Sequence, residues 1–389
     1  MKEKYDLYSL SNRQSKILRV LYVLRGATAL QIAKYLYNTR ILTRSQEKYT
    51  YSQLAHLVDK GFVNFNKSNN KRIKHSLYYL TSKGLSQIQS YYMIQDDFEG
   101  VGWVPDYSFE KQGFFHYDVH SPPFNQLEHH LMLVDFFINI SIDRNEEFEY
   151  RNNLYSVRKY GKNQKLRMDA EVKYGERKIA IELDRGTERY TQLVEKFKNY
   201  RLYLQSSKDK NEITDILIVV RDIANDSKLR QRWETIISAY LIAMDEFALK
   251  VDLHLCEISD VYNFMYRHFG FNSYKQILTK VVNNTDYQKV LETTTYDVLK
   301  FKNGNYLLMF FETQYSTKII RILYEANNLP KLHYLIGKTK GFKVDYQYNI
   351  YKYPIPIRFV GLMNKVNEIS NPNILRWKEL SYIGGTKNE

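Results

Sequence analysis

Three acidic residues, Asp169, Glu182 and Asp184, occur in the segment RMDAEVKYGERKIAIELDRGTE at positions 167–188. Carboxylates held close together repel one another, so at least one pKa rises unless a cation lies between them. A hard, oxygen-seeking ion such as Mg²⁺ or Mn²⁺ resolves this conflict, activates water and stabilises charge on a phosphate. The three acids therefore predict a divalent-metal site of the kind that cleaves phosphodiesters. Solvated positions on an exposed hairpin are the ordinary alternative.

A β-hairpin would bring these acids together. Alternating apolar residues predict strands at 166–172 and 178–183, and the polar residues 174–177 between them predict a four-residue loop. In this register Val172 faces Ile179, and the same pairing places the first acid opposite the second. The third acid, two residues further on, shares their face because side chains in a strand alternate.

The elements that follow complete a known order. A turn at 185–187 precedes a periodic helical segment, and an apolar strand follows at 215–220. Strand, hairpin, strand with Glu-x-Asp, helix and strand resembles the PD-(D/E)XK nuclease core, the restriction-endonuclease-like fold. More narrowly, DA followed by IELDRGTE and a Lys-containing helix ending near a Tyr resembles the replication-relaxation family of plasmids and integrative elements, which is similar to the C-class mobilisation relaxases. The resemblance covers roughly residues 10–255 and implies a relaxase or endonuclease acting on DNA.

The segment departs from the general nuclease pattern at one position, because Asp184 stands where Glu-x-Lys would have its lysine. A cationic group that assists the reaction must then come from elsewhere. Lys196 on the following helix is the first choice and Arg185 the second, while a solvated helix lysine is the alternative for Lys196. In related endonuclease folds an acidic or His group on the helix before the strands approaches the metal. The resemblance therefore implies Glu128 or His129 as an extra ligand, although such residues more often flank a core helix.

Composition limits the setting of this chemistry. A chain of 389 residues with 44% hydrophobic content predicts two or three domains with buried cores. The single cysteine, Cys256, excludes a disulfide framework and fits a reducing cytoplasm. The N-terminus does not read as a signal or transit peptide, and no apolar run approaches the roughly 18 residues of a membrane span. We therefore expect a cytoplasmic protein with no membrane span.

The positive charge is concentrated at one end of the chain. Of the net +14, residues 1–95 account for +12, with 16 Lys or Arg against 4 Asp or Glu, and the remaining residues have 41 against 39. Such asymmetry is typical of nucleic-acid binding, because neutralised phosphates release counterions. A membrane surface would attract the same charge, but no basic amphipathic helix with aromatic residues on its apolar side is apparent.

The same region has the outline of a winged helix. Apolar spacing predicts helices at 12–24, at 28–37 and at 49–60, the last ended by Gly61. Two strand-like runs then flank the loop NKSNNKRIKH. In a winged helix the third helix enters the major groove of double-stranded DNA and the basic loop contacts the backbone.

Specific residues follow from this arrangement. The residues of the third helix that the core does not need are predicted to face the groove: Thr50, Tyr51, Ser52, Gln53 and His56. The basic loop is predicted to contact phosphates through Lys67, Lys71, Arg72 and Lys74. A winged helix used for protein contacts is the alternative.

The sequence divides into a winged-helix domain at 1–95, a connector at 96–125, a PD-(D/E)XK nuclease-like domain at 126–258 and a C-terminal αβ domain at 259–389. The fold class is thus α+β or α/β multidomain. Within the last part, TYDVLKFKNGNYLLMFFETQYSTKIIRILYEANNL repeats the order of Asp297, hairpin, strand with Glu312, and helix, with Gln314 at the second acid position. A degenerate second nuclease-like unit is one interpretation, and an unrelated small αβ unit is the other.

Other chemistries lack their motifs. The sequence has no His-hydrophobic-His cluster, no Gly-rich phosphate loop and no CxxC. Among 35 tyrosines no nucleophile is singled out, although Tyr160, Tyr190 and Tyr200 are near the acids in sequence, so a metal-activated water is the simpler nucleophile. We expect sequence-specific DNA nicking at a plasmid or conjugative-element origin of transfer or replication. The alternative is a non-catalytic replication-initiation or regulatory protein with an endonuclease-like scaffold. A homodimer is compatible with either function.

Overall fold

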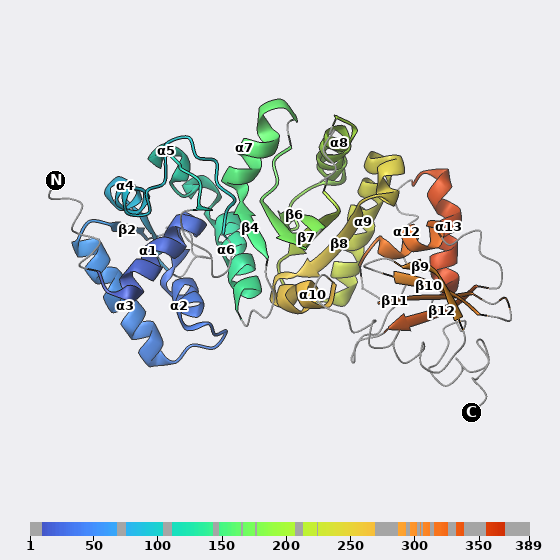
Figure 1. The fold of residues 1–389 in the computed structure, drawn as a ribbon, viewed down its shortest axis with the longest axis horizontal. Helices are drawn as coiled ribbons and strands as arrows, with labels where there is room; N and C mark the ends of the chain where they lie inside the picture. The colour runs from blue at the N-terminus through green and yellow to red at the C-terminus, as the bar shows by residue number, and fades with distance from the viewer. Residues whose placement is uncertain are drawn as a thin grey trace.

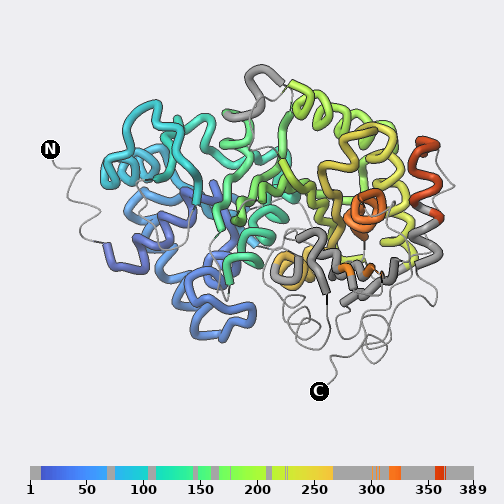
Figure 2. The backbone as a smooth tube through the Cα atoms, turned by 45° about the vertical axis from the view of Figure 1, so that its right-hand side comes forward, coloured from blue at the N-terminus to red at the C-terminus, as the bar shows by residue number. Residues whose placement is uncertain are grey.

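The computed structural model shows three β-sheets that follow one another along the chain (Figure 1). It describes residues 10–67, 75–103, 111–142, 148–164, 166–175, 177–206, 213–223, 225–268, 287–292, 296–301, 304, 306–311, 315–325, 332–337 and 355–369. Figure 2 shows the N-terminal helices on one side of the central strands and the C-terminal elements on the other. Among the described helices, none combines the length and apolar character needed to cross a membrane.

The N-terminal unit has the element order of a winged helix. Its sheet is antiparallel, in the order β1-β3-β2, and its first helix begins and ends where the periodicity predicts. The predicted third helix begins five residues earlier than expected, because Thr43 caps it reciprocally with Gln46. The elements are α1 (Asn12–Leu24), β1 (Ala27–Thr28), α2 (Ala29–Tyr37), α3 (Arg44–Asp59), β2 (Val63–Asn66) and β3 (Leu77–Leu80).

The segment after the winged helix ties it to the central unit. It contains α4 (Ser82–Tyr91), α5 (Tyr117–His120) and the short 3-10 helix η4 (Phe124–Gln126). The buried Arg25 guanidinium donates to the carbonyl oxygens of residues 119, 120 and 121. The side-chain amide of Gln31 donates to Asp135 on the first helix of the central unit, at 2.8 Å. These bonds, together with a shared hydrophobic core, fix the two units against each other.

The central unit is a five-stranded mixed sheet in the order β4-β5-β6-β7-β8. The pairs β4/β5 and β5/β6 are antiparallel, whereas β6/β7 and β7/β8 are parallel. Helix α6 packs against one face of the sheet, and α8 and α9 cover the other. The elements are α6 (Leu127–Ser141), β4 (Glu149–Asn152), α7 (Asn153–Gln164), β5 (Ala170–Tyr174), β6 (Arg177–Asp184), α8 (Tyr190–Ser206), β7 (Asp215–Val220), α9 (Asp226–Met244), η5 (Asp245–Leu249) and β8 (Asp252–Glu257).

The hairpin β5/β6 has the predicted register, with Val172 paired to Ile179. The predicted four-residue loop is wrong, however, because Tyr174 and Arg177 continue the ladder and leave a two-residue turn. Gly175 begins that turn with a φ of 55°, a left-handed conformation that glycine adopts without a Cβ clash. The register of the acids is unaffected, since extending a hairpin at its turn does not change which residues face each other.

The C-terminal unit repeats this topology. Strands β9, β10 and β11 are antiparallel neighbours, and β11 and β12 are parallel, which matches β4 to β7 in both order and direction. The predicted order of hairpin followed by helix is confirmed. The described elements are η6 (Ile258–Asp260), α10 (Val261–His268), β9 (Tyr287–Glu292), β10 (Tyr296–Phe301), β11 (Tyr306–Phe311), α12 (Lys318–Glu325), β12 (Leu332–Gly337) and α13 (Ile357–Ile369).

Candidate active site

The first two acids meet at one end of the β5/β6 hairpin. Asp169 directly precedes β5, and its backbone N–H donates to the Ile181 carbonyl at 3.2 Å. Its carboxylate Oδ2 accepts from the Leu183 N–H at 2.8 Å. These two bonds place Asp169 alongside Glu182, at the edge where the parallel strands β6, β7 and β8 have their carboxyl ends. Ligands of open α/β sheets bind at this type of edge.

Glu182 is 3% exposed and has two partners from α8. Its Oε1 accepts from the Tyr200 hydroxyl at 2.5 Å, and its Oε2 lies 3.0 Å from Lys196 Nζ. Burial raises the pKa of this carboxyl to about 7; the charge of Asp169 acts in the same direction, and Lys196 and Tyr200 oppose it. A buried carboxyl with a pKa near neutrality, next to a second acid, is typical of functional sites.

Lys196, the first choice for a cationic group near the acids, does contact Glu182. It lies one helical turn before Tyr200 on the same face of α8, and its ammonium is also 2.8 Å from Glu188 Oε1. Burial lowers the pKa of Lys196, but the carboxylates of Glu182 and Glu188 outweigh burial and raise it. The amine therefore stays charged. Strand β6 has no lysine two residues after Glu182, and Lys196 of the following helix α8 provides a cation beside Glu182 instead.

Asp184 has a different environment from the other two acids. It is 1% exposed, and its Oδ2 forms an ion pair with Arg232 Nε from α9. Its Oδ1 accepts from the Gly186 N–H at 2.7 Å, and Arg232 also donates to the Glu188 carbonyl at 2.8 Å. An arginine thus already compensates this carboxylate. Sequence reasoning missed Arg232 because several basic residues occur near the start of α9 and only tertiary packing selects one of them.

The helix before the strands adds one group to the site. His129 Nε2 on α6 lies 2.8 Å from Asp169 Oδ1. Burial lowers the pKa of His129, while its hydrogen bond to Asp169 and the charges of Asp169 and Glu182 raise it, and the net direction is upward. Glu128 points elsewhere, because its Oε2 accepts from Arg185 and Arg221. Of the two suggested extra ligands, His129 therefore contacts one of the acids, whereas Glu128 is engaged by two arginines. Arg185, the second choice for a catalytic cation, contacts Glu128.

The donor set of this edge fits a hard dication. The oxygens of Asp169 and Glu182 each accept one of the interactions above, and a carboxylate oxygen can accept two. Carboxylate oxygens are also the ligands that Mg²⁺ and Mn²⁺ prefer. Among the described residues, though, Asp169, Glu182 and Asp184 do not gather their oxygens within 4.8 Å of one another. A metal bound at this edge would therefore be held by Asp169 and Glu182.

A second group of metal-type side chains lies at the opposite ends of β7 and β8. Asp215, Asp252 and His254 place their potential ligand atoms within 4.8 Å of one another, and all three are buried. Arg321 donates to both oxygens of Asp252, at 3.0 and 2.7 Å, and Arg177 lies 3.5 Å from Asp215. Burial raises the pKa of Asp215, but Arg177 and His254 outweigh it and hold the pKa below its usual value. Fixed cations already neutralise these acids, so we assign the group to structure.

The predicted groove-facing residues of α3 do not all face outward. Thr50 is 1% exposed and its hydroxyl donates to the Gln46 carbonyl at 2.9 Å, so its assignment to the groove is wrong. Tyr51, Ser52 and His56 are exposed. Gln53 is partly exposed and accepts from the Gln14 amide at 3.0 Å.

The earlier start of α3 adds two basic residues to its exposed surface. Arg44 and Lys48 are exposed at positions one turn apart and continue the stripe of Tyr51 and Ser52. The Thr43-x-x-Gln46 capping box is the sequence signal that could have found them. In the predicted wing, Lys67 is exposed. Lys71, Arg72 and Lys74 lie outside the described residues, as does the side chain of Tyr160.

Fold and site together define a class: a winged helix joined to a mixed-sheet domain with acids and a lysine at the carboxyl edge of its parallel strands. A family model described as replication-relaxation matches residues 18–217, which is just over half of the chain. The chain belongs to the replication-relaxation family, and this membership indicates a role in DNA replication or mobilisation. A search of curated proteins finds no match. The matched region runs from α1 to β7, so it includes the three acids and Lys196 but neither Arg232 nor the C-terminal unit.

Proposed function

We propose that this protein is a sequence-specific, divalent-metal-dependent DNA nicking enzyme that acts at a plasmid or conjugative-element origin. The observation that carries the proposal is the arrangement of Asp169, Glu182 and Lys196 at the carboxyl edge of the central sheet. Two carboxylates and a fixed ammonium are the groups needed to hold a dication and balance charge on a reacting phosphate. The winged helix would select the double-stranded site.

Each residue has a separate task in this proposal. Asp169 and Glu182 would hold Mg²⁺ or Mn²⁺, which supplies Lewis-acid chemistry when bound. Lys196 keeps its proton at Nζ and stabilises negative charge beside Glu182. Tyr200 fixes the Glu182 carboxylate through its hydroxyl, and His129 does the same for Asp169. Asp184, committed to Arg232, would orient the turn that begins α8.

A metal-dependent nicking assay on origin DNA tests the proposal directly. Supercoiled plasmid carrying the cognate origin is incubated with the protein and Mg²⁺, Mn²⁺ or EDTA, and the wild type is compared with Glu182→Ala. We expect conversion to open circles with either metal, none in EDTA and none with the variant. Equal nicking by both proteins would refute the assignment of the site.

A non-catalytic function has one observation in its favour. The acids are all engaged by protein groups, Glu182 by Lys196 and Tyr200 and Asp184 by Arg232, which stabilises the edge even in the absence of a cation. In that case the protein would be a DNA-binding replication-initiation or regulatory protein. Origin binding that is unchanged in Glu182→Ala, together with no metal-dependent nicking by the wild type, would support this second function.

A further inference from the structure

Two arginines, Arg185 and Arg221, follow the ends of neighbouring strands next to the candidate site. Asp184 and Val220 are register partners at the ends of the parallel strands β6 and β7, and Arg185 and Arg221 are the residues that follow them. Neighbouring strands are about 4.8 Å apart, so the two side chains start close together. Both reach Glu128 Oε2, Arg221 through Nη2 at 3.1 Å.

The group formed by Arg185, Arg221 and Glu128 could bind an anion. Glu128 is nearly buried, whereas the side chains of Arg185 and Arg221 are 32% and 45% exposed. Each guanidinium has five N–H donors, and one carboxylate shared by two of them leaves a net positive charge. Because Glu128 restrains both guanidinium groups, little further side-chain entropy is lost when they bind a ligand. Arginine forks match phosphate oxygens in geometry and charge.

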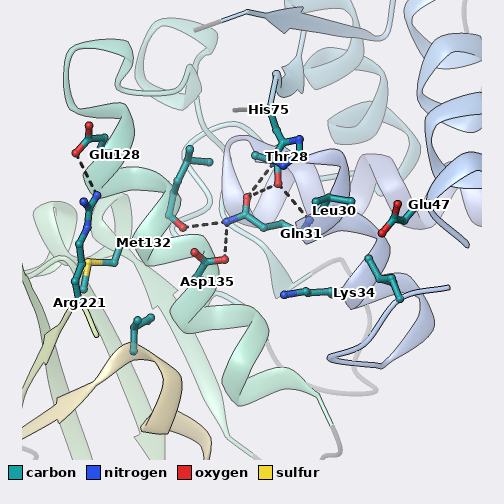
Figure 3. A pocket seen from close by; sticks show the side chains of 13 residues that line it. Thr28, Leu30, Gln31, Lys34, Glu47, His75, Glu128, Met132, Asp135 and Arg221 are labelled. Atoms are coloured by element: carbon teal, nitrogen blue, oxygen red, sulfur yellow. Dashed lines mark hydrogen bonds and ion pairs between the residues drawn. The ribbon is translucent and has the colours of Figure 1, made fainter. Parts of the chain in front are cut away.

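Glu128 and Arg221 also line a cleft between the winged helix and the central unit. This cleft has a volume of about 530 Å³, and Figure 3 shows Glu128 and Arg221 on one side of it and residues of the winged helix, including Lys34 and His75, on the other. Glu128 is the neighbour of His129, whose ring contacts Asp169. An anion bound by the arginines would therefore lie between the DNA-binding helices and the acids.

We propose that Arg185 and Arg221 bind a backbone phosphate of the DNA strand presented to Asp169 and Glu182, with Glu128 as the positioning residue. This inference rests on the proposed function, since it assigns a DNA strand to the same edge. It adds a phosphate subsite on the opposite side of the acids from Lys196, because Arg185 and Arg221 lie on the α6 face of the sheet and Lys196 on the α8 face.

Binding measured without catalysis tests the subsite. The probe is a fluorescein-labelled decathymidylate, titrated by anisotropy in EDTA at several salt concentrations, so that no cleavage takes place. We expect Arg221→Ala to weaken binding about 5- to 10-fold and to reduce the salt slope by about 0.7, the value for one single-strand phosphate. Arg185→Ala should behave similarly. The matched control is Arg358→Ala, which removes a half-exposed arginine of α13 paired with Asp245 and should leave binding unchanged.

Glu128→Gln separates positioning from bulk charge. This variant makes the protein more positive, so a purely electrostatic effect would tighten binding, whereas loss of the restraint on both arginines weakens it. Tighter binding by Glu128→Gln, wild-type binding by Arg221→Ala, or an equal loss in Arg358→Ala would overturn the subsite.

Failure of the subsite is distinguishable from failure of the proposed function. Nicking that survives with wild-type affinity in Arg221→Ala refutes the subsite alone. Binding lost in Arg221→Ala by a protein that does not nick refutes catalysis alone.

A different observation, the topology of the C-terminal unit, carries a second inference. Its strands and helix α12 follow the order β9-β10-β11-α12-β12, with the same strand directions as β4-β5-β6-α8-β7. The central unit has one additional helix, α7, between β4 and β5. The connection from β11 to α12 corresponds to the turn between β6 and α8. In the central unit that turn begins with Arg185 and directly follows Asp184.

Residues 315–317, the part of the corresponding connection that the structure describes, are buried against β8. The Leu255 N–H donates to the Tyr315 carbonyl at 3.0 Å, and the Thr317 N–H donates to the Leu253 carbonyl at 2.9 Å. Residues 315–317 are at most 8% exposed. Residues 315–317 therefore add to the edge of the central sheet, so this part of the connection is used for docking. Glu312 and Gln314, which correspond in sequence to Glu182 and Asp184, lie outside the described residues.

We further propose that the C-terminal unit is a degenerate second copy of the nuclease-like unit, retained for docking, which leaves the chain one cleavage centre. A protein with one centre cuts one strand per encounter. On supercoiled origin DNA we expect open circles as the product, complete loss of cleavage in Glu182→Ala, and a wild-type rate in Glu312→Ala. Linear DNA formed in the first turnover, or loss of cleavage in Glu312→Ala, would overturn this proposal.

Calorimetric binding of Mn²⁺ provides a readout without DNA. We expect Glu182→Ala to lose Mn²⁺ binding and Glu312→Ala to retain it. A chain that keeps Mn²⁺ binding in Glu182→Ala but loses it in Glu312→Ala would place the metal in the C-terminal unit and refute the proposal. Absence of Mn²⁺ binding in the wild type would refute both this proposal and the proposed function.

Discussion

The central sheet carries a cluster of acids at each end of its parallel strands, and the two clusters differ in how their charge is balanced. At the amino ends, Asp215 and Asp252 are paired with two arginines and a histidine in a buried network. At the carboxyl ends, Glu182 shares Lys196 with Glu188, Asp169 is paired with His129, and the pKa of Glu182 is raised to about 7. Closeness of ligand atoms alone would select the first cluster as a metal site. Charge balance is the reason why we propose the second, because a cation gains most where the protein has left negative charge uncompensated.

The largest expected effect is on catalysis at the carboxyl edge. Asp169→Asn keeps an oxygen for the Leu183 N–H but removes the charge, so we expect metal-dependent nicking to fall by about 100-fold or more with little loss of stability. Nicking rate on origin plasmid and the urea midpoint measure the two effects. An Asp169→Asn protein that nicks at the wild-type rate would remove the distinction between the clusters.

Breaking the other cluster should affect folding instead. Arg321→Ala leaves Asp252 buried without its bidentate partner, and we expect the free energy of unfolding to drop by about 3 kcal/mol. Urea denaturation measures this change, and Mn²⁺ affinity should be unaffected. Arg358→Ala, which breaks the exposed pair with Asp245, is the control and should cost less than about 1 kcal/mol. A metal affinity that fell in Arg321→Ala would indicate that the amino-end cluster binds the ion.

The pH dependence follows from the raised pKa of Glu182. Folding favours its protonated form, so the stability that this proton contributes is complete below the ordinary pKa of 4.5 and is lost as the pH rises through about 7. Cation binding needs the carboxylate and should strengthen over the same range. Calorimetry with Mn²⁺ at several pH values is the measurement, and an affinity that does not change across neutrality would contradict the prediction.

Tyr200→Phe sharpens this test. It removes a hydrogen bond that favours the charged Glu182, so the midpoint of the pH dependence should move upward by about 1 pH unit. Tyr240→Phe, which removes a buried hydroxyl donor to the Val251 carbonyl instead, is the matched control and should leave that midpoint in place. Equal midpoints in Tyr200→Phe and wild type would show that the hydroxyl does not set the pKa.

The smallest effect concerns a charge outside both clusters. Lys48→Ala removes an exposed cation from α3, and we expect duplex origin binding to weaken a few-fold with a salt slope reduced by about 0.9. Fluorescence anisotropy at several salt concentrations measures it. Mn²⁺ affinity and urea stability should be those of the wild type, because Lys48 contacts neither cluster.

Local patterns predicted the elements that carry the site. The alternation around the β5/β6 turn was sufficient for the correct register, and the apolar period was sufficient for α1, because burying one face of an element sets its period. The extension of α3 and the burial of Thr50 were missed. The capping box of Thr43 and Gln46 is a sequence signal for the earlier start of α3. The burial of Thr50 depends on how α3 packs on α1 and the sheet.

What the sequence by itself determined is the set of acids, their register and the basic character of the N-terminal domain. All three depend on spacing along the chain, which a strand or helix converts directly into position. The tertiary structure decided the partners: Lys196 and Tyr200 for Glu182, Arg232 for Asp184, and two arginines for Glu128. These contacts join residues from separate helices and strands. Which of many basic side chains reaches a given acid depends on how whole elements pack, and that packing determined which acids remain under-compensated.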